Sequence, residues 1–156
     1  MSLLNKSMKI IEYFDTLDKE YWLSQIAKGD WVAANYLHYL LKENKFYDLV
    51  GDNSRVLMLT ENNKLIAFCT LAEKDDVQPT DLTPWVGFLY TFPSYRGKGY
   101  AKELISYAEN LAKSDGKSNL YISTNHIGLY EKYGYEFYSF ANDVNGEETR
   151  VYRKKL

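Results

Sequence analysis

Residues 85–124 constrain the fold of this chain more than any other part of the sequence. They begin with "WVGFLYTF", continue through "YRGKGYAKELISYAENLAK" and end with "NLYIST". The first and last runs are typical of strands, whereas Leu104, Ile105 and Ala108 in the middle run recur at helical spacing. A strand, a helix and a second strand in this order predict a right-handed crossover between two parallel strands.

The other elements are expected to surround this unit. We expect a strand over 8–14, helices after Asp18 and over 31–44, two strands over 54–73 with a turn at 61–63, a loop over 74–84, a short helix over 127–134, and strands over 135–141 and 149–156. The order predicts an α/β (α+β) fold with a mixed, mostly antiparallel sheet of about six to seven strands and about four helices on its faces. In the second helix Val32, Tyr36, Tyr39 and Leu40 fall on one side.

Size and charge exclude several classes of function. The 156 residues fit one domain over 1–156, with residues 1–7 expected to be flexible or left over from cloning. A net charge of -2 argues against a nucleic-acid partner, and no apolar run approaches the length of a membrane span, so a cytoplasmic protein without a membrane partner is expected.

The thiol and imidazole side chains that typically bind zinc are sparse. Cys69 is the only cysteine, so neither an internal disulfide nor a thiolate zinc cluster can form, and its apolar surroundings indicate a buried side chain. The two histidines, His38 and His126, lie far apart in the sequence. We therefore expect no metal.

The turn "YRGKGYA" before the long helix has the features of an anion site. The first N–H groups of a helix have no partner within it, and glycine lets a phosphate approach them closely. Arg96 and Lys98 add positive charge. The run matches neither the P-loop pattern nor the full glycine pattern of dinucleotide-binding folds. The alternative is a basic turn without a ligand.

Two motifs in register resemble the GNAT superfamily of N-acetyltransferases. "YRGKGYA" resembles its R/Q-x-x-G-x-G/A signature, and "GLYEKYGYEFY", some thirty residues on, resembles its LYEK helix and the strand after it. The element order from Met8 to the C-terminus agrees with that fold. The resemblance implies that the two central parallel strands splay apart and that acetyl-coenzyme A is the cosubstrate.

The same resemblance implies where that cosubstrate would bind. The pyrophosphate would lie on the backbone of the glycine turn, and pantetheine would add to the preceding strand as an extra strand does. The residues expected at the cofactor are Leu89, Tyr90, Thr91, Arg96, Gly97, Lys98, Gly99, Tyr100 and Ala101. Asn125 joins them as the expected N-cap of the short helix, although its spacing to the LYEK tyrosine is five residues where many members have seven.

The catalytic groups follow from the second motif. The tyrosine of LYEK, Tyr130, would be the general acid that protonates the departing thiolate. His126 lies four residues earlier and is a candidate base if both share a helix face. Glu73 and Asp81 are further candidates, because the strand 85–92 carries no Glu, a position that supplies the base in some members.

The expected acceptor is a primary amine of a small molecule or a peptide. The acidic run "EKDDVQPTD" is either a solvated loop or a rim that attracts a cationic amine. The alternative function is a regulatory module that binds acetyl-coenzyme A with weak or no turnover. Dimers are common in the family, so the resemblance also allows a homodimer.

Overall fold

The computed structural model describes residues 7–156, which form a seven-stranded sheet in the order β1-β2-β3-β4-β5-β7-β6. The strands are β1 (Met8–Glu12), β2 (Arg55–Glu61), β3 (Lys64–Ala72), β4 (Trp85–Thr91), β5 (Asn119–Thr124), β6 (Glu136–Asn142) and β7 (Glu148–Lys155). All neighbouring pairs are antiparallel except β4 and β5. The predicted mixed fold is confirmed. Residues 1–6, which belong to the segment expected to be flexible or left over from cloning, lie outside the described residues.

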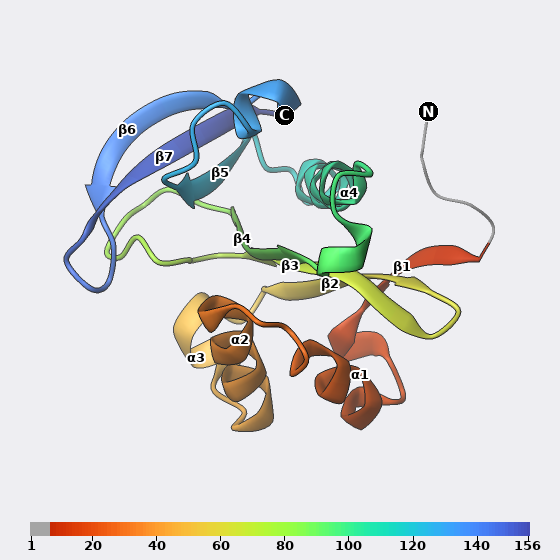
Figure 1. Ribbon diagram of the computed structural model, residues 1–156. Helices are drawn as coiled ribbons and strands as arrows, with labels where there is room; N and C mark the ends of the chain where they lie inside the picture. Colours follow the sequence, from red (N-terminus) through yellow and green to blue (C-terminus); the bar gives the residue numbers. More distant parts are fainter. Residues whose placement is uncertain (1–6) are drawn as a thin grey trace.

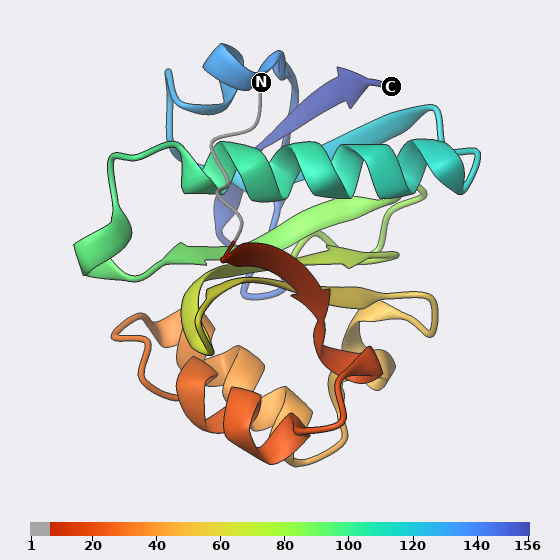
Figure 2. The ribbon, with the colours of Figure 1, turned by 90° about the vertical axis from the view of Figure 1, so that its right-hand side faces the viewer.

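Helices cover the sheet on both faces (Figure 1). The α-helices are α1 (Lys19–Ile26), α2 (Val32–Lys42), α3 (Phe46–Val50) and α4 (Tyr100–Ser114), and the 3-10 helices are η1 (Tyr13–Asp15), η2 (Pro93–Tyr95) and η3 (Tyr130–Tyr133). Figure 2 shows α4 running across one face of the sheet, with α1 and α2 against the opposite face. The crossover β4–α4–β5 therefore forms as predicted.

Each face of the sheet has its own apolar core. Beneath α4, Leu104, Ile105 and Ala108 pack with Cys69 and other buried residues of the central strands. Beneath α1–α3, a second core contains Ile26, Leu37 and Phe68 among others. A smaller cluster around Trp85 lies near the loop that precedes β4. The burial of Cys69 raises the pKa of its thiol to about 12, so that it behaves as an apolar residue, as expected.

Local signals placed most element ends correctly. The carboxylate of Asp18 accepts a hydrogen bond from the N–H of Tyr21 and caps α1. Asn62 and Asn63 both adopt positive φ in the turn between β2 and β3, which is the conformation that asparagine tolerates best among residues with a side chain. The helix α3 was not predicted, because its five residues carry no periodic pattern.

Two sequence predictions were wrong in detail. In α2 the structure buries Ala34, Leu37, Leu40 and Leu41, and leaves Val32, Tyr36 and Tyr39 exposed. The helix has more apolar residues than one face holds, and the tyrosines keep their hydroxyl groups in water on the outer side. The short helix after β5 starts at Tyr130 rather than at residue 127 and is a 3-10 helix.

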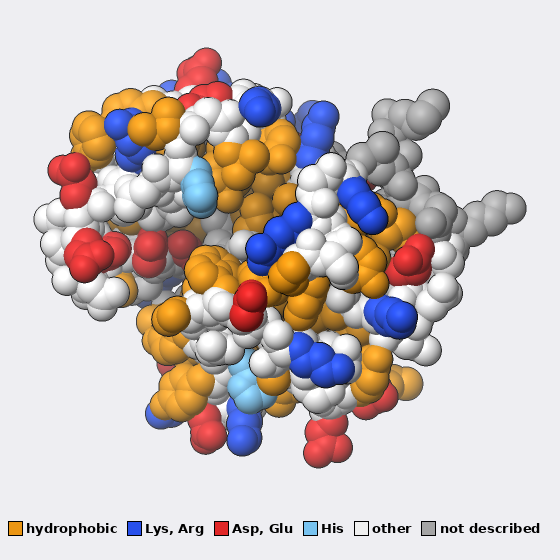
Figure 3. Space-filling view, viewed as in Figure 1, with side chains coloured by type: hydrophobic (Ala, Val, Ile, Leu, Met, Phe, Trp, Pro, Cys, Tyr) orange, Lys and Arg blue, Asp and Glu red, His pale blue; other side chains and the backbone are white. Residues whose placement is uncertain are grey.

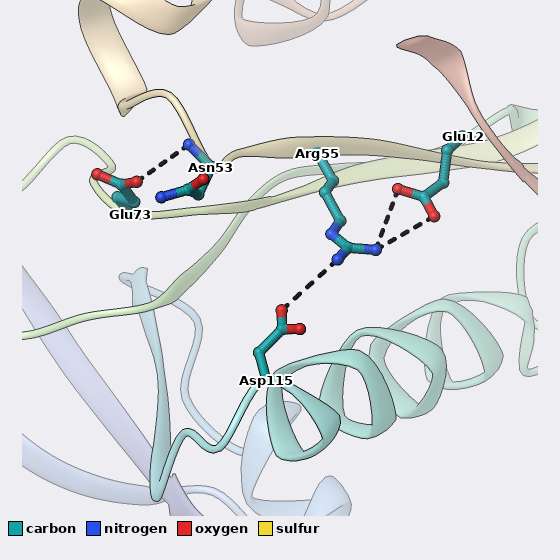
Figure 4. A network of polar contacts seen from close by, with 5 residues as sticks. All are labelled: Glu12, Asn53, Arg55, Glu73 and Asp115. Carbon is teal, nitrogen blue, oxygen red and sulfur yellow. Dashed lines mark hydrogen bonds and ion pairs between the residues drawn. The ribbon is translucent and has the colours of Figure 1, made fainter. Parts of the chain in front are cut away.

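A polar network joins the sheet to the C-terminal end of α4 (Figure 4). Arg55 of β2 lies 3.3 Å from a carboxylate oxygen of Glu12 and 3.6 Å from one of Asp115, the residue that follows α4. Nearby, the carboxylate of Glu73 accepts a hydrogen bond of 3.0 Å from the N–H of Asn53. The contact between Arg55 and Asp115 joins β2 to the end of α4 opposite to the glycine turn.

Candidate active site

The strands β4 and β5 pair over only two positions, Trp85 with Tyr121 and Val86 with Ile122. Both strands continue, β4 to Thr91 alongside β3 and β5 to Thr124 alongside β7. The β4–β5 divergence, which we define as residues 87–91 and 123–124, therefore interrupts the centre of the sheet. In it, backbone groups of two adjacent strands no longer bond to each other. The splayed parallel pair that the resemblance implied is present.

A β-bulge in β4 produces this divergence. The register with β3 shifts between Phe68 and Thr70, and Phe88 has φ of 50°, a conformation that a residue with a side chain seldom adopts. A bulge bends its strand and increases the local twist. Beyond it the alternation resumes, with Leu89 packing on the α4 face and Tyr90 on the opposite face.

The backbone beyond the bulge presents hydrogen-bonding groups toward β5. The N–H of Phe92 donates to the carbonyl of Ile66 in β3. Because N–H groups point to alternate sides along a strand, those of Leu89 and Thr91 point away from β3, into the divergence. The backbone of Tyr90 faces β3 instead.

The turn between β4 and α4 exposes bare backbone. Gly97 and Gly99 have φ of 77° and 83°, and no atom lies within 4 Å of the position that a Cβ on Gly97 would take. Gly99 is the N-cap of α4 and supplies no side-chain cap. The first N–H groups of α4, from Tyr100 and Ala101 onward, thus have no partner in the helix, and the helix dipole adds positive potential there. The turn fits an anion.

The two cations of the turn behave differently. Lys98 is exposed and forms no hydrogen bond or ion pair with residues 7–156. The Nε of Arg96 donates to the carbonyl of Thr91 at 2.8 Å, and its guanidinium lies 5.3 Å from the ring centroid of Tyr90. The hydroxyl of Tyr90 in turn donates to Asp30. Lys98 is the more available charge, and Arg96 also braces the end of β4.

Tyr130 lies in the core on the α4 face of the divergence, together with Cys69 and Leu89. Its side chain is 7% exposed, and burial raises its pKa to about 12, with smaller contributions from Tyr133 and Cys69. A phenol with so high a pKa keeps its proton at every physiological pH. Tyr130 can therefore donate a hydrogen bond or a proton, and cannot act as a base near neutral pH.

A partly buried network holds the segment that carries Tyr130. Glu109 of α4 accepts a hydrogen bond of 2.8 Å from the hydroxyl of Tyr135 and lies 3.0 Å from the Nζ of Lys154. The same Nζ donates to the carbonyl of Tyr133, the last residue of η3, at 2.9 Å. Burial, with the neighbouring carboxylate of Glu109, raises the pKa of Tyr135. The network ties η3 to both α4 and β7.

Neither of the two residues expected before Tyr130 takes the expected local role. Asn125 and His126 lie exposed in the loop after β5, and the N-cap of η3 is Leu129, without a side-chain cap. The backbone N–H of His126 donates to the hydroxyl of Thr124. Since η3 begins only at Tyr130, His126 and Tyr130 do not share a helix face.

The two carboxylates suggested as bases lie away from the divergence. Glu73 is bound to the N–H of Asn53, and its carboxylate packs against Gly51. Asp81 lines a hollow of about 370 Å³ with residues from the C-terminal end of α4. Because α4 spans 15 residues, or about 22 Å, this hollow is far from the glycine turn.

Two neighbouring carboxylates that sequence reasoning did not single out lie at the divergence instead. An oxygen of Asp75 lies 2.0 Å from the position that a Cβ on Gly87 of β4 would occupy. Asp76 interacts with the hydroxyl of Ser123, the first residue of β5 after its pairing with β4 ends. The signal in the sequence was Gly87, the one residue in an otherwise bulky strand that leaves room for a foreign side chain.

The environment of Asp75 perturbs its protonation. Asp75 is partly exposed, and the partial burial of its carboxylate against Gly87 raises its pKa to about 7, with Asp76 adding to the effect. Burial also raises the pKa of Asp76, with Asp143 adding to it and Ser123 opposing it. In Figure 3, acidic side chains gather on the left, over the β6–β7 turn and the loop before β4.

Other possible sites are limited in the described part of the chain. A larger hollow, of about 900 Å³, lies between β1 and α1, with Trp22 and Asp18 in its wall, away from the divergence. Within residues 7–156 no three His, Cys, Asp or Glu side chains are arranged to hold a metal ion. No helix of this part combines the length and apolar character needed to cross a membrane.

Known structures share this architecture. A GNAT family acetyltransferase from Elizabethkingia anophelis with acetyl-CoA bound is 15% identical, with a TM-score of 0.67, and the match covers 97% of this chain and 100% of that one. An acyl-CoA N-acyltransferase from Pseudomonas aeruginosa is 23% identical, with a TM-score of 0.64 and coverage of 94% and 97%. An acetyltransferase from Streptococcus agalactiae 2603 is 20% identical, with a TM-score of 0.66 and coverage of 97% and 100%.

Sequence comparison gives the decisive assignment. No curated protein matches the chain. The family described as "Acetyltransferase (GNAT) family", however, matches residues 14–135, which include the glycine turn, the β4–β5 divergence and Tyr130. The chain belongs to the GNAT family of acetyltransferases.

Proposed function

We propose that this protein transfers the acetyl group of acetyl-coenzyme A to a primary amine of a small molecule or a peptide, by direct attack in a ternary complex. Membership of the family indicates acetyl transfer from acetyl-coenzyme A. The observation that carries the proposal is the β4–β5 divergence, with a bare helix N-terminus at one end and a buried tyrosine beside it.

The glycine turn supports the position of the cosubstrate. The N–H groups at the start of α4 and the free cation Lys98 would bind the pyrophosphate, and Gly97 leaves its approach open. The carbonyl of Leu89 and the N–H and carbonyl groups of Thr91, which point into the divergence, would bond to the amides of pantetheine, as an added strand does. Thr91 shares its carbonyl with Arg96.

The reaction then needs a donor for the thioester oxygen and a donor for the sulfur. The N–H of Leu89, next to the bulge, is a suitable backbone donor for an oxyanion. Tyr130 lies on the α4 face and carries its proton at working pH. Full proton transfer from a phenol of pKa about 12 to an ordinary thiolate is uphill, so Tyr130 acts first by hydrogen bonding to the sulfur as negative charge develops there.

A module that binds acetyl-coenzyme A without turnover is the second candidate. It is favoured by the absence of any acidic side chain on β4 itself. The two candidates make different predictions, because both need the cosubstrate but only the enzyme releases thiol.

The experiment is a panel of primary amines, incubated with acetyl-coenzyme A and the protein, with free thiol as the readout. We expect thiol release above the amine-free rate with at least one amine. Stabilisation by acetyl-coenzyme A in thermal melting without thiol release for any amine would favour the module. Absence of stabilisation would refute both candidates.

A further inference from the structure

Gly87 leaves a space on β4 that a carboxylate from another segment occupies, whereas β4 has no acidic side chain of its own. We call this space the seat. Asp75 comes from the loop between β3 and β4, and its oxygen occupies nearly the place of a side chain on Gly87. A separation of 2.0 Å from a Cβ position means that any residue with a side chain would displace it. The loop is fixed beside it, because the side chain of Gln78 bonds to the carbonyl of Asp75 at 2.8 Å and to that of Leu49 at 3.3 Å.

This seat lies on the face of the sheet opposite α4. Val86 packs in the core under α4, so its neighbours Trp85 and Gly87 point to the other face. Phe88 also packs on that face, and its ring lies 6.4 Å from that of Tyr36 on α2. Asp75 therefore stands across the divergence from the anion site and from Tyr130, beside an aromatic surface.

Two buried polar atoms next to Asp75 have no partner among residues 7–156. One is the hydroxyl of Thr70, which is fully buried and, as the partner of Gly87 across β3 and β4, points to the same face. The other is the Oδ1 of Asp76, whose carboxylate reaches Ser123 on β5. Buried polar atoms are nearly always bonded. The hydroxyl of Thr70 can donate or accept, whereas the ionised carboxylate of Asp76 can only accept and therefore calls for a donor. An ammonium group supplies three.

On the basis of the proposed function, we propose that Asp75 binds the ammonium group of the acceptor and removes its proton, with Asp76 holding the positive charge from the β5 side. The Asp75 carboxylate takes one proton from R–NH₃⁺, and the nitrogen lone pair then forms the C–N bond with the acetyl carbon. The C–S bond breaks, its electron pair goes to sulfur, and the hydroxyl of Tyr130 stabilises the developing charge by hydrogen bonding. The nitrogen loses its second proton to the departing sulfur, so that coenzyme A leaves as the free thiol, and Asp75 returns the first proton to solvent.

The charges around Asp75 suit this cycle. Asp76 faces it from its own loop, and Asp143, from the turn after β6, faces Asp76. The backbone N–H of Val144 in that turn donates to the carbonyl of Asp76 at 2.8 Å, which holds the two acidic segments together. The pKa of about 7 lets Asp75 exchange a proton near neutral pH. A bound ammonium lowers that pKa, and loss of its proton raises it again.

The test compares Asp75→Asn with Asp81→Asn, which makes the same change in the same loop but away from the divergence. The first measurement is calorimetric binding of n-butylamine and of 1,4-diaminobutane to the protein loaded with coenzyme A. We expect Asp75→Asn to weaken binding about tenfold and Asp81→Asn to leave it unchanged. The second is thiol release from acetyl-coenzyme A with the same amines between pH 6 and 9.5.

In the rate assay we expect Asp75→Asn to lower kcat/KM about 100-fold and to remove the wild-type limb near pH 7. Gly87→Ala, which retains the carboxylate but occupies its seat, should cause a similar loss. Retained thermal stabilisation by acetyl-coenzyme A shows that each variant is folded. If Asp75→Asn is not stabilised by acetyl-coenzyme A, it is replaced by Asp75→Ser, for which the same loss of kcat/KM is expected.

The outcomes separate the two proposals. Thiol release by Asp75→Asn at the wild-type rate and pH profile would overturn the role of Asp75 and leave the proposed function intact. Amine binding that depends on Asp75 without thiol release in the wild type would overturn the proposed function and keep only the ammonium seat. If the wild type neither binds these amines nor releases thiol with them, the ammonium seat is overturned for them, and the wider amine panel decides the function.

Discussion

The two faces of the β4–β5 divergence use burial in opposite ways. On the α4 face, burial raises the pKa of Tyr130 to about 12 and keeps a proton on it. On the other face, burial raises the pKa of Asp75 to about 7 and brings a carboxyl group into the range where it gains and loses a proton. Burial thus leaves Tyr130 as a group that only donates a hydrogen bond or a proton, and makes Asp75 a group that gains and loses a proton near neutral pH. The chemistry depends on where each group starts, at about 10 for a phenol and about 4 for a carboxyl.

The faces also differ in their charge. The turn at the start of α4 offers backbone N–H groups and Lys98 without a side-chain cap, whereas the loop before β4 offers carboxylates. This separation suits an anionic cosubstrate on one side and a cationic acceptor on the other. Substitutions on either face can test this separation of charge independently.

The largest effect is expected for Tyr130→Phe. Removal of the hydroxyl should lower kcat about 100-fold, because the sulfur loses its donor, while the affinity for acetyl-coenzyme A stays within about twofold. Steady-state rates with a reactive amine and calorimetric titration of acetyl-coenzyme A measure the two quantities. Tyr133→Phe, in the same 3-10 helix, serves as the matched control. A Tyr130→Phe rate equal to the wild-type rate would remove Tyr130 from the mechanism.

The next effect is on the anion site and uses a pair of nearly isosteric substitutions. Gly97→Asp places a negative charge on the turn, whereas Gly97→Asn imposes the same backbone demand at positive φ without the charge. We expect Gly97→Asp to weaken binding of acetyl-coenzyme A about 30-fold and Gly97→Asn to weaken it about threefold. Titration calorimetry distinguishes them. Equal losses for both would mean that backbone geometry, and no anion, explains the turn.

A third prediction concerns stability and sets the two faces apart. The folded-state pKa of Asp75 lies above its ordinary value of 3.8, so the folded protein holds this proton more tightly than the unfolded chain does. The stabilising effect of that proton is complete below about pH 4 and is lost as pH rises through 7. Asp75→Asn should therefore match the wild type at pH 4 and exceed its free energy of unfolding by about 4 kcal/mol at pH 8.

Urea unfolding of both proteins across this range measures the difference. Asp76, whose charge adds to the raised pKa of Asp75, is present in both proteins, so the difference measures Asp75 together with its coupling to Asp76. The phenol of Tyr130 stays protonated throughout, and Tyr130→Phe should show no such dependence on pH. A constant difference between Asp75→Asn and the wild type would contradict the raised pKa.

The smallest effect is expected for Glu109→Gln, in the network that holds η3. Gln retains the shape but loses the charge that attracts Lys154, so η3 and Tyr130 should be held less firmly. We expect kcat to fall about threefold with affinity for acetyl-coenzyme A unchanged, together with a lower melting temperature. Glu103→Gln, earlier on α4, is the comparison variant. Unchanged kcat with a lower melting temperature would limit the network to stability.

The crossover, the glycine turn and the tyrosine of the second motif could all be predicted from the amino-acid sequence. Each of these is local or periodic: a run of strand residues, a helical stripe of apolar side chains, two glycines before a helix. Such patterns are set by backbone dihedrals and by the burial of one face, and both can be recognised within a short window. The N-cap at Asp18 and the asparagine turn at Asn62 and Asn63 belong to the same class.

Which carboxylate lies at the divergence, and which side of α2 is buried, could not be predicted before the fold was known. The residues Glu73, Asp75 and Asp81 belong to one polar loop, and nothing in their own sequence distinguishes them. Their difference comes from Gly87, twelve residues after Asp75, and from a bulge in β4. The pKa of a group depends on the atoms around it in space, and a loop brings those atoms together only when the sheet has formed.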